Sequence, residues 1–204
     1  MFISKLGKES YNDPKSFRPI SLSNYLLKGL ERLAVWHMDI RLKENPVHAR
    51  QHGFRSDRST ETAISELTSY VESFILKKEY CIGVFLDIRG AFDNIKPDCI
   101  HQSLLKFGAQ RDMADWYLGY LKQRNVFFTL GNVTVARSVG IEFPQGGVAS
   151  AKFWLMAFDG AVKIINSCGV VGTAFADDCA VLYGGHNVGH VLRTLQIIVN
   201  RLTD

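Results

Sequence analysis

The sequence has no apolar run long enough to cross a membrane, because none approaches the roughly 20 residues that a transmembrane helix needs. Residues 1–8 also lack the apolar stretch of a secretory signal peptide. We therefore expect an intracellular protein without a membrane partner, in the nucleus or the cytoplasm. With 204 residues, 47% of them hydrophobic, the chain can build one substantial core or two closely packed lobes.

Cysteine is scarce and scattered, and the sequence has no C-x-x-C pair. The six histidines show no metal-ligand spacing with the four cysteines, so a structural zinc site is not indicated. The thiols are expected to be buried: Cys81, Cys99, Cys168 and Cys179.

A strong excess of one charge is also missing, since the net charge is only +4. The charges are unevenly placed, however. Residues 1–60 carry 11 Lys or Arg against 6 Asp or Glu, whereas residues 61–204 carry 13 against 14. A basic N-terminal third favours an anionic partner such as nucleic acid, and an ordinary solvated surface stays the alternative.

Apolar residues recur at helical spacing in several stretches. The first of these begins at Asn24 and is stopped by Asn45-Pro46, and another is opened by Pro97. The predicted helices are 24–44, 59–78, 97–107, a segment ending near residue 125, 150–166 and a C-terminal helix that includes 191–202.

Strands are predicted where apolar runs are short and continuous or flank a turn signal. Residues 81–86 form such a run and place Asp87 at its end. Residues 126–130 and 133–141 flank Gly131-Asn132 and predict a hairpin. Residues 170–183 predict a second hairpin with Asp177-Asp178 at its tip, because Asp tolerates turn conformations.

Three carboxylates therefore follow or interrupt apolar strands, at Asp87, Asp177 and Asp178. Two carboxylates about 4 Å apart repel by roughly 4 kcal/mol at an effective dielectric constant of 20, and loss of hydration adds to this cost. A hard divalent cation such as Mg²⁺ would relieve the repulsion, since it takes oxygen ligands. The simpler alternative is that Asp177-Asp178 only turns a hairpin and Asp87 only caps a helix.

Five short motifs occur one after another along the chain, and their combination weighs against that simpler alternative. Together they resemble the reverse transcriptases of non-LTR retrotransposons, especially the insect jockey-like and R1-like elements, over nearly the whole chain. The motifs are Phe17-Arg-Pro-Ile-Ser21, Gln51-His-Gly-Phe-Arg55 with Arg58-Ser-Thr60, Phe85-Leu-Asp-Ile-Arg-Gly-Ala-Phe-Asp-Asn94, Phe143-Pro-Gln-Gly-Gly-Val148 and Ala174-Phe-Ala-Asp-Asp178.

The resemblance implies an α+β fold with the fingers and palm of a polymerase. It places fingers at 1–80 and 96–140, and a palm at 81–95 and 141–204. The palm is expected to be a small antiparallel sheet backed by helices. No thumb follows in this sequence, so one reverse transcriptase domain, truncated at its C-terminus, is expected.

The implied function is RNA-directed DNA synthesis by two-metal-ion nucleotidyl transfer. It would use dNTPs, an RNA template with a DNA primer, and two Mg²⁺ ions for which Mn²⁺ substitutes; no oligomeric state is implied. By the resemblance, Asp87 and Asp177 bind both metals, Asp178 is the third carboxylate, and the Ile88 carbonyl completes one ion's shell.

The resemblance also implies a nucleotide-binding set. Phe92 matches an aromatic residue that leaves no room for a ribose 2′-hydroxyl, and Gln145 and Gly146 match a loop against the incoming nucleotide and template. Arg55 and Arg58 match fingers residues that grip the triphosphate, which suits the bidentate guanidinium.

Two alternatives stay open. The first is an inactive retroelement remnant that at most binds RNA, favoured by the missing thumb and by Ala149 and Ala151 beside Ser150. The second is an RNA-templated RNA polymerase palm, which Phe92 opposes because such an enzyme must accept the 2′-hydroxyl. Comparing dNTP with NTP incorporation separates these functions.

Overall fold

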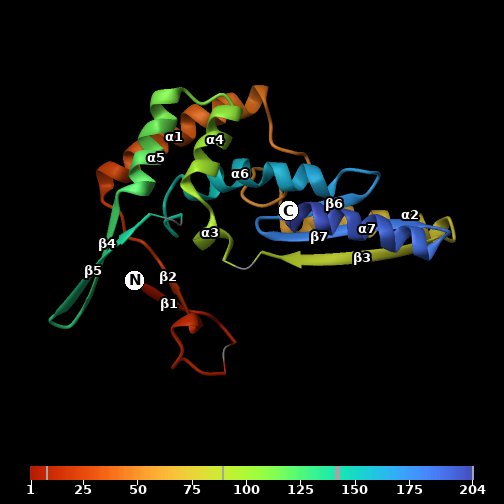
Figure 1. The fold of residues 1–204 in the computed structure, drawn as a ribbon, viewed down its shortest axis with the longest axis horizontal. Coiled ribbons are helices and arrows are strands. Elements are labelled where there is room, and N and C mark those ends of the chain that lie inside the picture. The colour runs from red at the N-terminus through yellow and green to blue at the C-terminus, as the bar shows by residue number, and fades with distance from the viewer. Residues whose placement is uncertain (8, 89, 141–142, 204) are drawn as a thin grey trace. The chain divides into compact units, whose positions relative to one another are not determined.

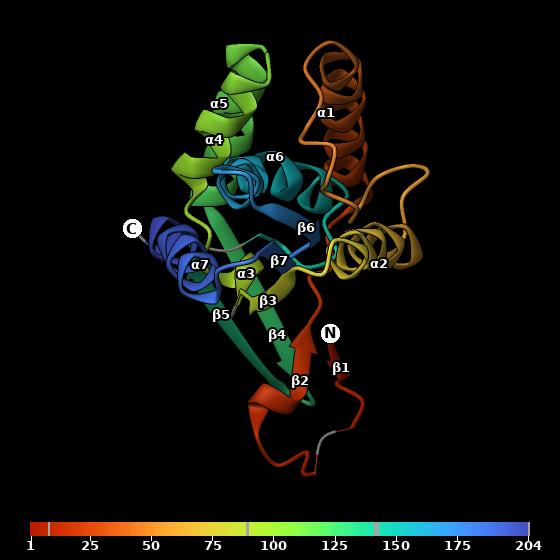
Figure 2. The ribbon, with the colours of Figure 1, turned by 90° about the vertical axis from the view of Figure 1, so that its right-hand side faces the viewer.

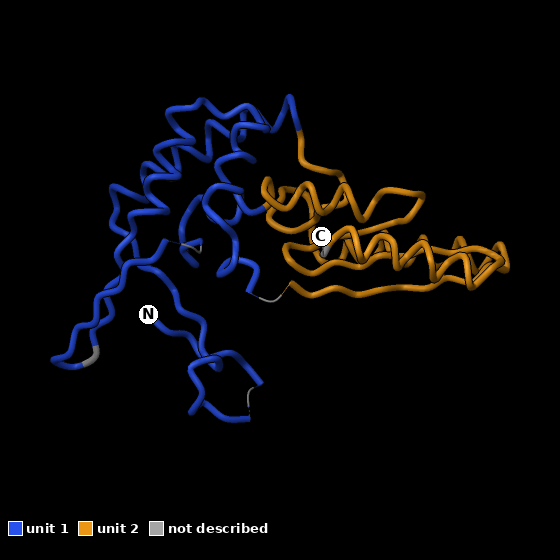
Figure 3. The backbone as a smooth tube through the Cα atoms, in the orientation of Figure 1, with its two compact units in different colours: residues 1–45, 90–154 blue, residues 46–89, 155–204 orange. Residues whose placement is uncertain are grey.

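A computed structural model describes residues 1–7, 9–88, 90–140 and 143–203 of the chain, and Figure 1 shows the order of its elements. These residues form two compact units, each built from segments far apart in the sequence (Figure 3). Unit 1 contains residues 1–45 and 90–154, and unit 2 contains residues 46–89 and 155–204.

Unit 1 is mainly helical and carries two small antiparallel ribbons. Its ribbons pair strand β1 (Phe2–Ser4) with β2 (Phe17–Pro19), and β4 (Arg124–Leu130) with β5 (Val133–Val139). A one-turn 3₁₀ helix, η1 (Pro14–Ser16), precedes β2. Its α-helices are α1 (Tyr25–Glu44), α3 (Ala91–Asn94), α4 (Pro97–Lys106) and α5 (Arg111–Lys122).

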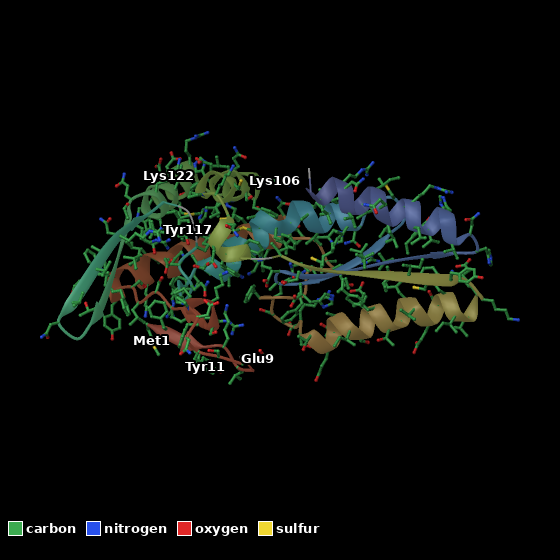
Figure 4. All side chains as sticks on the ribbon, turned by 60° about the horizontal axis from the view of Figure 1, so that its bottom comes forward. Met1, Glu9, Tyr11, Lys106, Tyr117 and Lys122 are labelled. Atoms are coloured by element: carbon green, nitrogen blue, oxygen red, sulfur yellow. The ribbon has the colours of Figure 1, made fainter. Side chains whose placement is uncertain are left out.

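Local sequence explains where these helices begin. Asn24 caps α1, because its Oδ1 accepts a hydrogen bond from the Leu27 N–H at 2.8 Å. Pro97 occupies the first turn of α4, where its missing N–H costs nothing. The core of unit 1 includes Tyr117, which Figure 4 labels among the side chains. Its ring is fully buried and meets that of Phe153 edge to face at 4.6 Å.

Unit 2 is built on a three-stranded antiparallel sheet in the order β3-β7-β6. Its strands are β3 (Tyr80–Asp87), β6 (Val171–Phe175) and β7 (Asp178–Gly185), and its helices are α2 (Thr60–Leu76) and α7 (Val188–Thr203). Helix α6 (Ser150–Ile165) runs from the last residues of unit 1 into unit 2.

Helices cover both faces of this sheet. Figure 2 shows α2 and α7 on opposite sides of it. On the α7 side, an apolar cluster includes Val162 of α6, Val181 of β7 and Ile198 of α7. On the α2 side, a Cβ at Gly184 would lie 2.5 Å from the ring of Phe74, so glycine lets the helix approach the strand.

The expected α+β class is confirmed, and the long predicted elements lie within a few residues of their predicted ends. The β1–β2 ribbon and the short helix α3 were not expected. Helix α6 begins at Ser150 despite the alanines around it, and the Ser150 hydroxyl donates to the Pro144 carbonyl at 2.8 Å.

The bounds of the two compact units differ from those of the expected fingers and palm. The units change at residues 45/46, 89/90 and 154/155, whereas the expected ranges change at 80/81, 95/96 and 140/141. Helix α2, expected in the fingers, packs on the sheet of unit 2. The assignment of fingers and palm stays a prediction. No helix among the described residues is both long and apolar enough to span a membrane.

The expectation of buried thiols was wrong for two of the four cysteines. Cys179 is buried and Cys81 is half-buried, whereas Cys99 and Cys168 are exposed. Cys99 lies on the outer face of α4, and Cys168 lies in the turn after α6 with a positive φ of 57°. Spacing in the sequence does not show on which face of a helix or turn a thiol lies.

Candidate active site

The antiparallel sheet of unit 2 brings two of the three expected carboxylates together. Asp87 is the last residue of β3 and Asp178 is the first residue of β7, and the register pairs them directly. Side chains of directly paired residues lie on the same face of the sheet, about 4.5–5.5 Å apart at Cβ. Two residues 91 positions apart in sequence thus become neighbours at one end of the sheet.

The third carboxylate, Asp177, lies in the two-residue turn between β6 and β7. Ala176, and not an aspartate, has the left-handed conformation in this turn, with φ 56°. The hairpin lies where the sequence predicted it, but the residue with the unusual conformation is Ala176 and not an aspartate. We call Ala176 and Asp177 the Asp177 turn.

The carboxylates are more open to solvent than the flanking apolar residues suggested. Asp87 and Asp178 are exposed and Asp177 is half-buried, although Cys179 and Ala180, which follow them, are buried. The reason is position: all three carboxylates lie where the strands end, so water reaches them past the edge of the core.

Despite this exposure, the pKa of Asp178 is raised, in part by charge repulsion among the three carboxylates. Partial loss of hydration, and then the charges of Asp177 and Asp87, raise the pKa of Asp178. Burial and the charges of Asp178 and Asp177 also raise the pKa of the Cys179 thiol to about 12, which leaves it protonated and unreactive. A bound cation would remove this repulsion, and carboxylate oxygens are the ligands that Mg²⁺ prefers.

Among the described residues, no three His, Cys, Asp or Glu side chains are arranged to hold a metal ion by themselves. Mg²⁺ in phosphoryl-transfer sites is usually bound through one or two carboxylates together with substrate phosphates, so part of its shell comes from the substrate. The paired Asp87 and Asp178 with Asp177 fit that requirement. Ile88, whose carbonyl is a further expected ligand, directly follows Asp87, the last residue of β3 that pairs with β7.

Arg55 and Arg58 belong to unit 2 as well. Arg55 is held by its own loop, since its Nη1 donates to the carbonyls of His48 at 3.0 Å and Gln51 at 3.1 Å. Burial, and then the charge of Arg58, lower the pKa of Arg55. Arg58 is exposed and borders a pocket whose lining also includes Thr62.

The other expected site residues lie in unit 1. Phe92 is in α3 and packs in an aromatic group, with its ring stacked on that of Trp154 at 5.2 Å and edge to face with that of Phe143 at 6.1 Å. Its carbonyl accepts a hydrogen bond from the Phe143 N–H at 2.8 Å. These contacts restrict the ring of Phe92 to a narrow range of orientations.

The loop with Gln145 and Gly146 is tied to two other parts of unit 1. The Gln145 side chain donates to Asp93 Oδ1 at 2.9 Å, and the Gln145 carbonyl accepts from the Ser21 N–H at 2.7 Å. Gly146 has φ 100°, and a Cβ there would lie 3.1 Å from the Ser21 carbonyl. Only glycine fits this position without strain.

Sequence reasoning missed Glu31, which supports the same loop. Glu31 has no exposed surface, and its Oε2 accepts a hydrogen bond from the Val148 N–H at 2.9 Å. Burial raises the pKa of Glu31, and the amides of Val148 and Ala149 partly offset this. The available signal was its position, since Glu31 falls on the apolar stripe of α1 with Leu27, Ala34 and Met38.

We expect Glu31→Gln to fold normally, because the amide oxygen can still accept from Val148. Glu31→Ala should be less stable than Glu31→Gln by about 1–3 kcal/mol, the cost of an unpaired, partly buried N–H. Denaturant unfolding of both variants measures this difference.

The pH dependence has a defined sign. Because the folded-state pKa of Glu31 is raised, the fold binds this proton more tightly, and wild-type stability falls as pH rises through the interval above 4.5. Glu31→Gln removes that loss, so its stability relative to wild type should be higher at pH 7 than at pH 4. An equal difference at both pH values would contradict this account.

Comparison with known proteins agrees with the geometry. A family model described as "Reverse transcriptase (RNA-dependent DNA polymerase)" matches residues 5–204. The chain is 29% identical over 92% of its length to the Pol polyprotein of the type-1 retrotransposable element R1 of Bradysia coprophila. It is 30% identical over 89% of its length to a probable RNA-directed DNA polymerase from transposon X-element of Drosophila melanogaster. It spans only 18% and 20% of these two relatives.

Solved structures show the same fold at much lower identity. A telomerase from Candida tropicalis in complex with a fragment of telomeric RNA matches with a TM-score of 0.64 at 9% identity, over 88% of this chain and 31% of that one. An apo telomerase from the same organism, truncated from its C-terminal domain, gives a TM-score of 0.62 at 10% identity, over 87% and 37%. At these identities the likeness concerns the fold alone.

Proposed function

The chain belongs to the reverse transcriptase family and is related to the polymerases of non-LTR retrotransposons such as R1 and jockey, and we propose that it carries the nucleotidyl-transfer site of an RNA-directed DNA polymerase. In this proposal a DNA primer paired with an RNA template is extended with dNTPs. The observation that carries it is the pairing of Asp87 with Asp178, one residue from Asp177.

The carboxylates give the proposed site its metal ligands. Asp87 and Asp177 would hold two Mg²⁺ ions, with Asp178 as the third carboxylate and the Ile88 carbonyl as a further ligand. When bound, such ions activate the primer 3′-hydroxyl and stabilise the departing pyrophosphate. Loss of hydration, and then the charges of Asp177 and Asp87, raise the pKa of Asp178. The charge repulsion among these groups supports the assignment, because a bound cation would relieve it.

Unit 2 also offers a surface beside these carboxylates. A shallow pocket of about 380 Å³ has Asp87 and Asp178 in its lining, together with Ile64 and Leu67 of α2 and the exposed ring of Phe85. Its apolar wall suits the sugar and base of a nucleotide whose phosphates lie toward the carboxylates.

The remaining residues are assigned to nucleotide recognition. Phe92 would exclude the 2′-hydroxyl of a ribonucleotide, and its contacts with Trp154 and Phe143 would keep the ring in place. Gln145 and Gly146 would lie against the nucleotide and template, where glycine permits a close backbone approach. Arg55 and Arg58 would bind the triphosphate.

The direct test measures Mn²⁺ binding to the chain by electron paramagnetic resonance, in the presence of an RNA/DNA primed template and a dNTP. We expect Asp177→Asn to weaken Mn²⁺ binding at least about tenfold, since a neutral amide is a poorer ligand than a carboxylate. Asp112→Asn, at an exposed aspartate of α5, is the matched control and should bind as wild type does. Equal or absent binding in wild type and Asp177→Asn would favour an inactive remnant instead.

A further inference from the structure

A segment of unit 2 far from the aspartates in sequence runs beside the end of strand β6. The His52 N–H donates to the Ala174 carbonyl at 2.7 Å, and the Ala174 N–H donates to the Arg50 carbonyl at 2.9 Å. Gln51 and Ala174 thereby form an isolated parallel bridge. Residues 50–52 are thus joined to β6 at this single bridge, next to the Asp177 turn.

Within this segment the Gln51 side chain binds the turn itself. Its Nε2 donates to the Ala176 carbonyl at 3.2 Å, and its Oε1 accepts from the N–H groups of Ala176 at 3.2 Å and Gly53 at 3.0 Å. Gln51 is only 1% exposed. One side-chain amide therefore holds both backbone polar groups of the residue that directly precedes Asp177.

The turn needs such support because of its backbone conformation. Ala176 has φ 56°, which is unfavourable for a residue with a Cβ. Gly53 allows the contact, since a Cβ there would lie 2.2 Å from the Ala176 nitrogen and 2.9 Å from its Cα. The close approach of the two backbones thus depends on glycine at 53.

The segment that carries Gln51 is itself fixed to α2. His52 is 1% exposed and bonds Thr62 Oγ1 through Nδ1 at 2.8 Å and Glu66 Oε2 through Nε2 at 2.9 Å. Arg50 Nε donates to the other oxygen of Glu66 at 3.0 Å. These hydrogen bonds hold the backbone on both sides of Gln51 against α2, and thereby position the Gln51 amide.

We propose that Gln51 is a positioning residue for the metal site: its amide fixes the backbone at Ala176 and thereby the direction in which Asp177 presents its carboxylate. The inference rests on the proposed function, since it assigns Gln51 a role toward the metal ligand Asp177. Within Gln51-His-Gly-Phe-Arg55, Gln51 would then support the metal ligand, while Arg55 is the residue assigned to the triphosphate. Supporting residues around a metal ligand typically change metal affinity by about 10–100-fold when replaced.

The chain offers a matched control at the opposite end of β6. There the Asn166 amide holds Gly172, donating to its carbonyl at 2.8 Å and accepting from its N–H at 3.0 Å. Its Oδ1 also accepts from Arg50 Nη1 at 2.6 Å, so replacing Asn166 removes one contact of the segment that carries Gln51 but leaves the Gln51 amide in place. Gln51→Met and Asn166→Leu each remove one side-chain amide that binds the backbone of β6 or its turn. Each puts an apolar side chain of similar size in its place. Only the first removes the amide beside Asp177.

Two measurements on these variants test the proposal. The first is hydrogen exchange at the Ala176 amide in the metal-free chain, and the second is Mn²⁺ affinity with primed template and dNTP. We expect Gln51→Met to speed exchange at Ala176 and to weaken Mn²⁺ binding at least about tenfold. Asn166→Leu should lower the unfolding temperature comparably yet change Mn²⁺ affinity less than about twofold.

A second variant guards against simple misfolding. Gln51→Glu keeps an acceptor for the N–H groups of Ala176 and Gly53 but loses the donor to the Ala176 carbonyl, so exchange at Ala176 should be slower than in Gln51→Met and faster than in wild type. The proposal is overturned if Gln51→Met binds Mn²⁺ as wild type does, or if Asn166→Leu weakens binding equally. If wild type binds no Mn²⁺, the proposed function fails, and exchange at Ala176 still decides whether Gln51 holds the turn.

Discussion

Asp87→Asn should reduce primer extension on an RNA template by roughly 10³-fold or more, because it removes a charged ligand that acts together with Asp177 and Asp178. The fold should not suffer. Asp87 is exposed at the end of β3 and pairs directly with Asp178, so the substitution removes a like-charge pair from the sheet. We expect an unfolding temperature equal to or above that of wild type, together with the loss of DNA synthesis.

The measurement is single-nucleotide extension of a labelled DNA primer, with circular dichroism melting of the same samples. Asp112→Asn serves again as the control for replacing an exposed aspartate. Undiminished extension by Asp87→Asn would remove Asp87 from the site. A wild-type chain that binds RNA but neither binds Mn²⁺ nor extends the primer would favour the remnant.

Phe92→Val should make the chain accept ribonucleotides, lowering its preference for dNTPs over NTPs by on the order of 10²-fold. Valine keeps an apolar side chain against Trp154 and Phe143 and removes the ring that would block the 2′-hydroxyl. The loss of volume should cost some stability, as in other large-to-small substitutions. The ratio of kcat/KM for a dNTP and for the matching NTP separates the two effects.

Phe127→Val is the matched control, because Phe127 is 68% exposed in β4 and carries no proposed role. It should leave the ratio unchanged. An unchanged ratio in Phe92→Val would mean that another group excludes ribonucleotides. A wild-type chain that uses NTPs as well as dNTPs would support the RNA-templated RNA polymerase.

The sequence predicted the features that depend on local period. Helix α1 follows from Leu27, Ala34 and Met38, and its ends follow from Asn24 and Asn45-Pro46. The six apolar residues before Asp87 located β3. Apolar spacing reports which side of an element is buried, and that information lies within one stretch of sequence.

Contacts between distant residues were not predictable in this way. Gln51 and Ala176 are 125 positions apart, and nothing in either stretch shows that an amide will support a turn. Glu31 was missed for a related reason: a carboxylate on an apolar stripe indicates a buried partner, and its partner, Val148, lies 117 positions away. The exposure of Asp87 likewise depends on where the sheet ends in space.

The pairing of β3 with β7 has a consequence for how the protein is made. Asp87 leaves the ribosome 91 residues before Asp178, the residue with which it pairs. At about 5–20 residues per second this interval lasts roughly 5–20 seconds. During that time β3, with Tyr80 and Phe85 exposed even in the finished sheet, has no β7 to pair with. A nascent strand with unpaired edges invites pairing with other chains, so we expect synthesis in cells to benefit from chaperones that bind this segment early.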